Sequence, residues 1–204
     1  MTLAELSEYL KKYVPLGSEV YCADLLINNK VHLNIKNPRL SKLGDYRPKQ
    51  NGQPHRISLN RDLNPYSFLI TFLHEIAHLL NFEKFGTKVA PHGPEWKREF
   101  KEVTEPMLEG KVFPLDVYQA LIKYMQNPYA SSCSDPGLMK VLHGYDSDSE
   151  WAMVDDISIN GRFKLKNGME FTKLHKKRTR YQCREDKTGR EYLVPGVSKC
   201  KSLN

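Results

Sequence analysis

The sequence predicts an α+β protein: a mainly helical domain with a small sheet, followed by a small β-ribbon or barrel-like module. Helical periodicity recurs along the first three quarters of the 204 residues, whereas short alternating segments around a hairpin signal fill the last quarter. Charge divides the chain at the same place, because residues 1–156 hold 18 basic and 20 acidic residues, and residues 157–204 hold 13 basic and 4 acidic ones. These patterns indicate a basic module appended to a near-neutral body.

Between the two parts, Asp, Glu, Gly and Ser cluster in a segment typical of a solvated linker. We therefore expect a first domain at residues 1–143, an acidic linker at 144–157 and a basic β module at 158–204. An apolar fraction of 40% and a charged fraction of 27% exclude a wholly disordered chain. The longest apolar stretch, Leu63–Leu73, is too short to cross a bilayer, and no basic and apolar leader opens the sequence, so we expect a cytoplasmic protein.

The first domain is expected to contain four helices and at least two strands. Thr2 and Glu5 form a capping box before leucines at helical spacing, so the first helix should run to about Tyr13. Strands are expected at 31–35 and 57–59, where apolar residues alternate with polar ones. The other three helices should begin at turns marked by Pro65, Pro94 and Pro114.

In the last quarter, Asn167-Gly168 stands between two alternating segments. This pair predicts a two-residue hairpin turn in which both residues have positive φ. Alternation resumes at 179–184 and, after another glycine turn, at 190–194. We therefore expect four short strands in the basic module.

A His-Glu-x-x-His pattern, His74 to His78, lies inside the longest expected helix, which begins at Pro65 and ends at Gly86. Residues four apart share a helix face, so the two imidazoles can take two corners of a zinc tetrahedron. Glu75 then stands beside the first ligand and can act as general base on a zinc-bound water. Burying three polar groups in a helix whose other neighbours are uncharged is costly unless they are paired or ligate a metal. The sequence therefore predicts a metal site.

A catalytic zinc needs a third protein ligand and an open fourth position. The metzincin continuation is absent, because Asn81 and Lys84 stand where it requires glycine and histidine. An imidazole route would use His92, in a segment stiffened by two prolines ahead of the next helix. A carboxylate route would use Glu95 or Glu99 on that helix. We favour His92 and keep the two carboxylates as the alternative.

Together with the later segment Pro91-His92-Gly93-Pro94-Glu95-Trp96-Lys97, the His74–His78 motif resembles the SprT-like zinc metallopeptidase family, which includes bacterial SprT and Spartan-like proteases. The resemblance extends to Asn64–Leu69 before the motif. The whole chain also resembles SprT-like domain proteins of Bacteroidetes-type bacteria, in segments such as Lys42–Arg47 and Ala130–Asp135. By this resemblance the first domain would be a helical zincin-like metallopeptidase domain with a small sheet. Its zinc ligands would be His74, His78 and His92, and its catalytic acid/base would be Glu75.

The resemblance implies a metallopeptidase with one catalytic zinc ion that hydrolyses peptide bonds of a protein substrate. Glu75 would take a proton from the zinc-bound water and return it to the leaving amine. Gly93 and Trp96 would be structural parts of the second motif. Tyr46 and Arg47, in a polar loop, are candidates for a further oxyanion donor. Two alternatives stay open: a non-hydrolytic zinc-containing adaptor that binds DNA or protein, and a hydrolase of a non-peptide amide.

The basic module is a candidate for DNA contact. Period-two alternation places its cations on one sheet face and its apolar residues on the other, an electrostatic footprint suited to nucleic acid. The candidate contacts are Lys164, Lys166, Arg178, Arg180 and Arg184. The likeness to Spartan, which acts on proteins at DNA, points the same way, so DNA-associated proteins are candidate substrates. A solvated basic face without a partner is the alternative.

Cysteine spacing argues against a second metal site. Many SprT-like proteins end in a zinc ribbon of paired cysteines, whereas this chain has single Cys133, Cys183 and Cys200 in that half. A second zinc would need a fourth ligand such as His143 or His175 at unusual spacing. We therefore expect the basic module to fold without metal.

Overall fold

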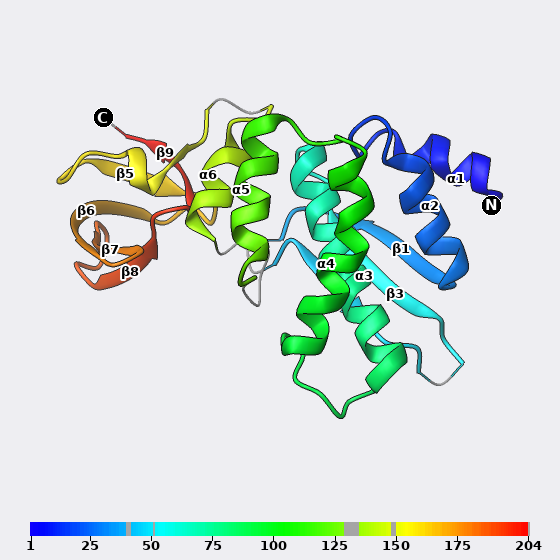
Figure 1. Ribbon diagram of the computed structural model, residues 1–204. Helices are drawn as coiled ribbons and strands as arrows, with labels where there is room; N and C mark the ends of the chain where they lie inside the picture. Colours follow the sequence, from blue (N-terminus) through cyan, green and yellow to red (C-terminus); the bar gives the residue numbers. More distant parts are fainter. Residues whose placement is uncertain (40–41, 51, 129–134, 148–149, 204) are drawn as a thin grey trace. The chain divides into compact units, whose positions relative to one another are not determined.

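The computed structural model describes the chain except for residues 40–41, 51, 129–134, 148–149 and 204. The fold of the described residues is α+β, as the sequence predicts, and it divides into two compact units, Met1–Tyr145 and Asp146–Asn204 (Figure 1). No helix among these residues is both long and apolar enough to span a membrane.

The first unit combines helices with a small mixed sheet. The sheet has the order β1-β3-β2, in which β1 (Val31–Lys36) runs parallel and β2 (Gly44–Arg47) antiparallel to the central strand β3 (His55–Asn60). The helices are α1 (Leu3–Leu10), α2 (Glu19–Asn28), α3 (Pro65–Phe85), α4 (Pro94–Glu109), α5 (Leu115–Met125) and α6 (Pro136–His143). Helix α3 packs on β2 and β3 and against α4 (Figure 1), so it lies at the centre of the unit.

Local signals in the sequence fix the ends of α3. Asn64 caps it, because the Asn64 side chain accepts a hydrogen bond from the Ser67 N–H at 2.9 Å, and Pro65 occupies the first turn. Gly86 ends it with a φ of 61°, which glycine adopts without steric cost. Most of the side chains between these ends are buried. Polar groups on α3 therefore lie in an apolar environment.

The other expected helices also form, with shifted ends. The capping box of Thr2 and Glu5 is present, but α1 ends at Leu10, before the expected end at Tyr13. Helix α4 begins at Pro94 as expected and continues to Glu109. Two further helices, α2 and α6, are absent from the sequence prediction. In α2 the first-turn signal is weak, because its N-cap residue makes no side-chain hydrogen bond to the helix.

The second unit is built on an antiparallel sheet with the order β4-β9-β5-β6-β7-β8. Its elements are β4 (Ala152–Met153), the 3-10 helix η1 (Val154–Asp156), β5 (Arg162–Leu165), β6 (Glu170–Lys177), β7 (Arg180–Glu185), β8 (Glu191–Pro195) and β9 (Lys199–Ser202). Met153 and Val154 come from the segment expected as a linker, yet both are buried in this unit. The domain boundaries at 143 and 158 stay a prediction about independent folding.

The hairpin between β5 and β6 forms where expected, but its turn differs from the prediction. Gly168 has a φ of 87°, whereas Asn167 does not have a positive φ. The Gly168 N–H donates to the Leu165 carbonyl at 2.9 Å, and the Leu165 N–H donates to the Met169 carbonyl at 2.9 Å. The turn is therefore closed by one glycine in the left-handed region, the arrangement of longer hairpin loops that end in a bulge.

The second unit has a lysine buried in its interior. Lys173 of β6 is 2% exposed, and its Nζ donates to the carbonyls of Val154, Asp155 and Ile157. The same Nζ lies 3.8 Å from the ring centroid of Tyr181. These contacts use all three ammonium donors, which allows a cation to occupy the apolar side of a strand. Lys173, which is not one of the candidate nucleic-acid contacts, is therefore a cation of this module that faces the interior.

Candidate metal centre

Helix α3 presents two histidines on one face. His74 is buried and His78, one turn later, is half-buried. Their Nε2 atoms lie 3.2 Å apart, and their ring centroids lie 4.9 Å apart. Both rings therefore direct a nitrogen into the same small space, as the spacing of the motif predicts.

The turn before α4 brings a third histidine to this face. The Gly93 N–H donates to the Ala90 carbonyl at 3.0 Å, and Pro94 begins the helix directly afterwards. This short turn places His92 so that one ligand atom from each of the three histidines lies within 4.8 Å of the others. The structure thus brings together the three residues that the sequence proposed as ligands.

The carboxylates considered as alternative ligands have other surroundings. Glu99 is 1% exposed, and both of its oxygens accept hydrogen bonds from Lys84 Nζ, at 2.7 and 2.9 Å. Glu95 lies in the first turn of α4, where its Oε2 is close to Gly93. Among the described residues, the one cluster of three or more side chains with metal-ligand spacing contains only histidines.

The chemistry of the three nitrogens fits a metal ion. The His92 Nε2 is buried and has no hydrogen-bond partner among the described residues. Burial, and then the neighbouring histidines, lowers the pKa of His74 to about 2 and that of His78 to about 3, and burial lowers the pKa of His92. The rings are therefore neutral at pH 7, the state in which imidazole binds zinc. Three such ligands leave a fourth position open.

Trp96 packs against the rings of the three histidines. It is fully buried, and its ring centroid lies 4.6 Å from that of His74 and 4.8 Å from that of His92. Its ring also stacks on that of Phe100, with 5.3 Å between the centroids. Because a rigid aromatic wall restricts the rotamers of the histidines, Trp96 preorganises the cluster.

Glu75 lies against strand β2. A β-carbon on Gly44 would stand 2.5 Å from the Glu75 Oε1 and 2.7 Å from the Thr71 Cγ2, so only glycine permits this approach. The carboxylate also accepts a hydrogen bond from the backbone N–H of Tyr46. Burial, and then the charge of Asp45, raises the pKa of Glu75 to about 8. A bound cation nearby would lower this pKa and favour the carboxylate form.

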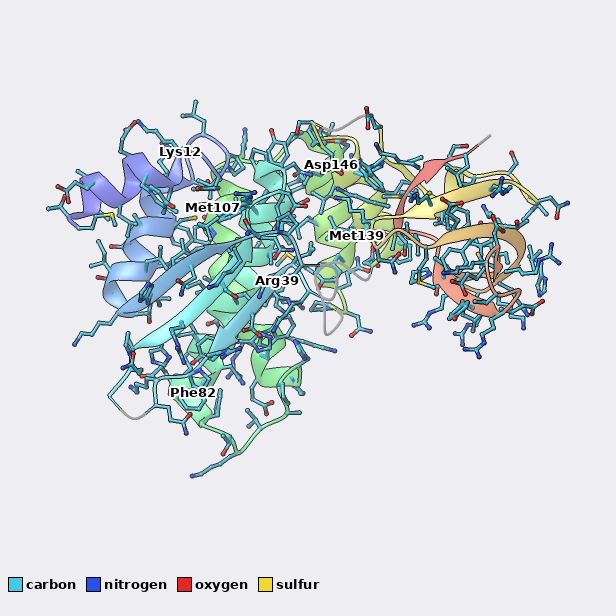
Figure 2. All side chains as sticks on the ribbon, turned by 180° about the vertical axis from the view of Figure 1, so that it is seen from behind. Lys12, Arg39, Phe82, Met107, Met139 and Asp146 are labelled. Carbon is cyan, nitrogen blue, oxygen red and sulfur yellow. The ribbon has the colours of Figure 1, made fainter. Side chains whose placement is uncertain are left out.

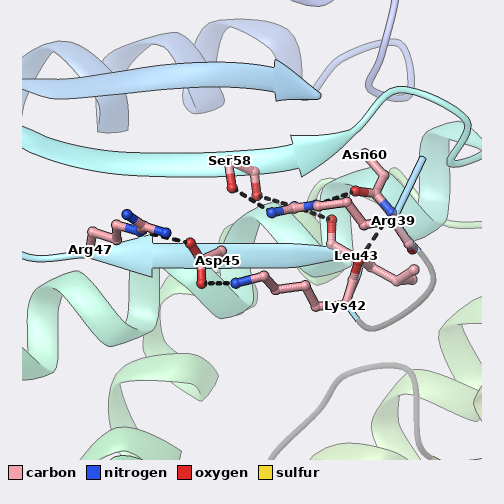
Figure 3. Close-up of polar contacts among 7 residues, drawn as sticks. All are labelled: Arg39, Lys42, Leu43, Asp45, Arg47, Ser58 and Asn60. Atoms are coloured by element: carbon pink, nitrogen blue, oxygen red, sulfur yellow. Dashed lines mark hydrogen bonds and ion pairs between the residues drawn. The ribbon is translucent and has the colours of Figure 1, made fainter. Parts of the chain in front are cut away.

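The start of β2 is fixed by Arg39, labelled in Figure 2 and enlarged in Figure 3. Its Nε donates to the Asn60 Oδ1 at 2.8 Å, and its Nη1 donates to the Ser58 Oγ at 3.0 Å. The Nη2 reaches the carbonyls of Ser58 at 3.2 Å and Leu43 at 3.4 Å. Asn60 donates back to the carbonyls of Arg39 and Lys42. This network anchors the loop on β3 and so sets the position of the strand beside Glu75.

Of the two residues considered for oxyanion stabilisation, Tyr46 lies beside the histidines. Its ring is parallel to that of His78, with 6.4 Å between the centroids, and its hydroxyl lies 2.9 Å from the His55 Nδ1. Arg47 instead pairs with Asp45 at 3.2 Å and is largely exposed. Sequence reasoning missed the strand that carries both residues.

Two of the five candidate nucleic-acid contacts lie beside acids on the second unit's sheet. The Lys164 Nζ is 3.2 Å from Glu170, and Arg184 lies directly opposite Glu191 in the strand register. This part of the sheet face is therefore mixed in charge.

The other three candidates have different surroundings. The Lys166 Nζ lies 5.2 Å from the ring centroid of Trp151. Arg178 and Arg180 are exposed at the turn between β6 and β7, within an exposed run, residues 175–180, of which five are His, Lys or Arg. Positive charge is therefore denser at this turn than on the sheet face.

The cysteines of the second unit are buried in its core as free thiols. Burial raises the pKa of Cys183 and of Cys200 to about 11, which leaves them protonated at neutral pH. Neither belongs to the metal-ligand cluster found among the described residues. Cys133 lies outside the described residues.

Comparison with known proteins gives one match. A family model described as the SprT-like family matches residues 20–119, a range that runs from α2 through α5 and includes all three histidines. No curated protein and no solved structure matches the chain.

Proposed function

The chain belongs to the SprT-like family through residues 20–119, and we propose that it is a zinc-dependent metallopeptidase with a zincin-like first domain that acts on protein substrates. One observation carries this proposal. His74 and His78 of α3 converge with His92, and α3 also holds the buried side chain of Glu75. Three neutral nitrogen ligands and an adjacent proton acceptor are what metal-assisted hydrolysis of an amide requires.

Zinc is the metal that we assign to the three histidines. Imidazole ligands suit zinc, and a set of three protein ligands is typical of catalytic rather than structural zinc sites. When bound, zinc would polarise the substrate carbonyl and lower the pKa of a water molecule. The protein contributes a preformed set of neutral ligands, with Trp96 packed against the rings.

Glu75 is the residue to which we assign proton transfer. It takes a proton from the attacking water and returns it to the leaving amine. Glu75 is 7% exposed and its carboxylate accepts from the Tyr46 N–H, so its direction is fixed before substrate binds. A cation bound at the histidines would lower the raised pKa of this buried group, so Glu75 would be a carboxylate able to accept a proton.

The strand beside Glu75 favours an extended peptide over a small amide as substrate. Strand β2 is an edge strand of the sheet. Just before it, the Leu43 carbonyl accepts a hydrogen bond from the Asn60 N–H of β3 at 2.9 Å. By the antiparallel alternation, the backbone groups of Gly44 and Tyr46 then face away from β3. The Tyr46 N–H is used by Glu75, and the remaining outward groups can pair with an added peptide strand.

Hydrolysis of an unfolded protein by the zinc-loaded chain tests this proposal. We expect the parent to cleave the substrate and Glu75→Gln to be inactive while it keeps its zinc. Full activity in Glu75→Gln would contradict the role of the carboxylate. Bound zinc without hydrolysis of peptides or small amides would instead favour the non-hydrolytic adaptor.

We further propose that the second unit contacts DNA through the turn between β6 and β7, which would direct the peptidase to DNA-associated proteins. The support is the exposed run at residues 175–180, where phosphates can approach several cations at once. Lys177, Arg178 and Arg180 are all exposed there.

Salt-dependent binding to double-stranded DNA tests this second part. Replacing Lys177, Arg178 and Arg180 together by glutamate should abolish binding. The matched control replaces Lys164 and Arg184, which lie beside acids, and should bind nearly as the parent does. Equal loss in both variants would contradict the assignment to the turn. Affinity that does not fall with salt would contradict phosphate contact.

A further inference from the structure

Tyr46 is held at both ends beside the metal centre. Its backbone N–H donates to the carboxylate of Glu75, and its hydroxyl lies 2.9 Å from the Nδ1 of His55. Between these ends its ring lies parallel to the ring of His78, and within 18° of parallel to the ring of His55 at 5.8 Å. One residue of β2 therefore contacts the proposed base and a buried histidine from another strand.

The contacts of His55 determine its tautomer. The Lys49 backbone N–H points at the Nδ1 from 3.3 Å, and because an amide N–H can only donate, the Nδ1 carries no hydrogen. The Nε2 therefore carries the ring proton, and it faces the Glu83 Oε1 at 3.2 Å. Since the Nδ1 is an acceptor, the Tyr46 hydroxyl is the donor in its contact with His55. The hydroxyl hydrogen of Tyr46 is thus committed to His55.

Glu83 closes this chain of hydrogen bonds onto helix α3. His55 is 4% exposed, and the ring of Phe82 (labelled in Figure 2) packs against its ring at 6.2 Å, so the histidine end of this contact is buried. The Lys49 Nζ lies 3.0 Å from the second Glu83 oxygen, so this carboxylate contacts both Lys49 and His55. The path from Tyr46 through His55 to Glu83 therefore joins β2, β3 and α3.

We propose that Tyr46, His55 and Glu83 form a positioning unit that holds β2 against α3 and so keeps the Tyr46 N–H on the Glu75 carboxylate. This inference rests on the proposed peptidase function. It makes Tyr46 a positioning residue and not an oxyanion donor, because its hydroxyl hydrogen is used by His55. Displacement of a reacting group by about 1 Å can cost about 100-fold in rate, so loosening the unit should lower kcat.

Substitutions at the two ends of the Tyr46–His55 bond isolate its contribution. Tyr46→Phe removes only the hydroxyl. His55→Phe keeps an aromatic ring at this position and removes its contacts with Tyr46, Lys49 and Glu83. His55→Asn can place an amide oxygen near the position of the Nδ1 and so keeps an acceptor for Tyr46. Glu102→Gln, in an exposed ion pair with Arg98 on α4, is the matched control.

Steady-state kinetics of the zinc-loaded variants give the first readout. We expect Tyr46→Phe and His55→Phe to lower kcat about tenfold or more with unchanged KM and zinc content. His55→Asn should recover much of the loss, and Glu102→Gln should match the parent. Parent-like kcat in both Tyr46→Phe and His55→Phe would overturn the proposal.

Nuclear magnetic resonance gives two readouts that do not depend on activity. The ring nitrogens of His55 should show a bare Nδ1 and a protonated Nε2. The backbone amide at position 46 should exchange slowly with solvent in the parent and faster in Tyr46→Phe and His55→Phe. A protonated Nδ1, or equal exchange in all variants, would overturn the positioning unit even in an active peptidase. An inactive chain that gives the expected spectra would contradict the proposed function alone.

Discussion

Gly44 of β2 and Glu75 of α3 approach so closely that a β-carbon on Gly44 would lie 2.5 Å from the Glu75 Oε1. Two residues along the same strand, the Tyr46 N–H donates to that carboxylate. The strand therefore forms the wall against which the proposed base rests. Helix α3 supplies the carboxylate, and contacts with β2 position its oxygens.

Gly44→Ala should therefore displace the base without disturbing the ligands. The added methyl group would force the Glu75 side chain aside, because the contact is far shorter than van der Waals packing allows. We expect a folded protein that keeps one zinc and loses about 100-fold in kcat. Activity assays beside elemental analysis check this expectation.

Gly137→Ala in α6 is the control for that substitution. Its new β-carbon would lie 3.2 Å from the Asp135 Oδ1, a milder contact within the first turn of a helix away from the histidines. We expect parent-like zinc content and activity. A Gly44→Ala protein as active as this control would contradict the close placement of Glu75.

His92→Ala and Glu99→Gln should separate metal binding from stability. His92→Ala should lose zinc, because it removes one of three converging nitrogens. Glu99→Gln should keep zinc but lower the free energy of unfolding by about 1–3 kcal/mol, since it weakens the hydrogen bonds between Lys84 and a buried side chain. Urea unfolding and zinc analysis of both variants check the pair. Zinc loss in Glu99→Gln would support the carboxylate as ligand.

The His55 side chain should make the metal-free protein sensitive to acid. Burial lowers the pKa of His55 from its ordinary 6.5, Glu83 opposes this shift and Lys49 adds to it. Because the folded pKa is the lower one, the unfolded chain takes up the proton first as pH falls, and the free energy of unfolding decreases below about pH 6.5.

Urea unfolding of the metal-free parent and of metal-free His55→Phe measures this dependence. Between about pH 7 and pH 5 the parent should lose more stability than the variant, because only the parent carries His55 with its lowered pKa. The other histidines are common to both proteins and cancel in the comparison. Parallel stability curves would show that His55 titrates normally in the folded state.

Removing the metal should abolish hydrolysis without unfolding the first unit. The core around α3 contains many fully buried apolar side chains that do not depend on a metal ion, among them Phe68, Phe72, Leu73 and Ile76. A chelator should therefore stop hydrolysis, leave the helical circular dichroism intact and lower the melting temperature, because zinc stabilises the folded state that binds it. Added zinc should restore activity. Loss of helical signal on chelation would instead indicate a structural metal.

Local sequence signals predict α3 and its histidines well. The Asn64-Pro65 start, the apolar run and the i, i+4 spacing are all encoded within one helix. His92 is also accessible to sequence reasoning, because the short turn before Pro94 limits where its side chain can go. The ligand cluster could therefore be proposed before the fold was known.

Strand β2 could not be predicted in the same way. Its residues, Gly44–Arg47, include glycine and aspartate, which are depleted in strands. The strand exists because it pairs with β3 and because Arg39 fixes the preceding loop on Asn60, contacts that are distant in sequence. For the same reason the partnership of Tyr46 with His55 leaves no local signal.

In the basic module, the alternation of residue types also fails to predict which cations are paired. Alternation along β6 and β7 predicts which residues face outward, but it does not record which charges are neutralised by neighbours. Lys173 faces the interior because three carbonyls satisfy it, and Lys164 is paired with Glu170. The structure adds that residues 175–180 are all exposed at the turn between β6 and β7.

Zinc content per chain tests most directly whether His74, His78 and His92 hold a catalytic zinc ion. Elemental analysis of parent protein purified without chelators should give one zinc per chain, and the His78→Ala variant should give none. Glu75→Gln should keep the ion. A folded parent that binds no zinc, or a His78→Ala variant that retains it fully, would contradict this assignment.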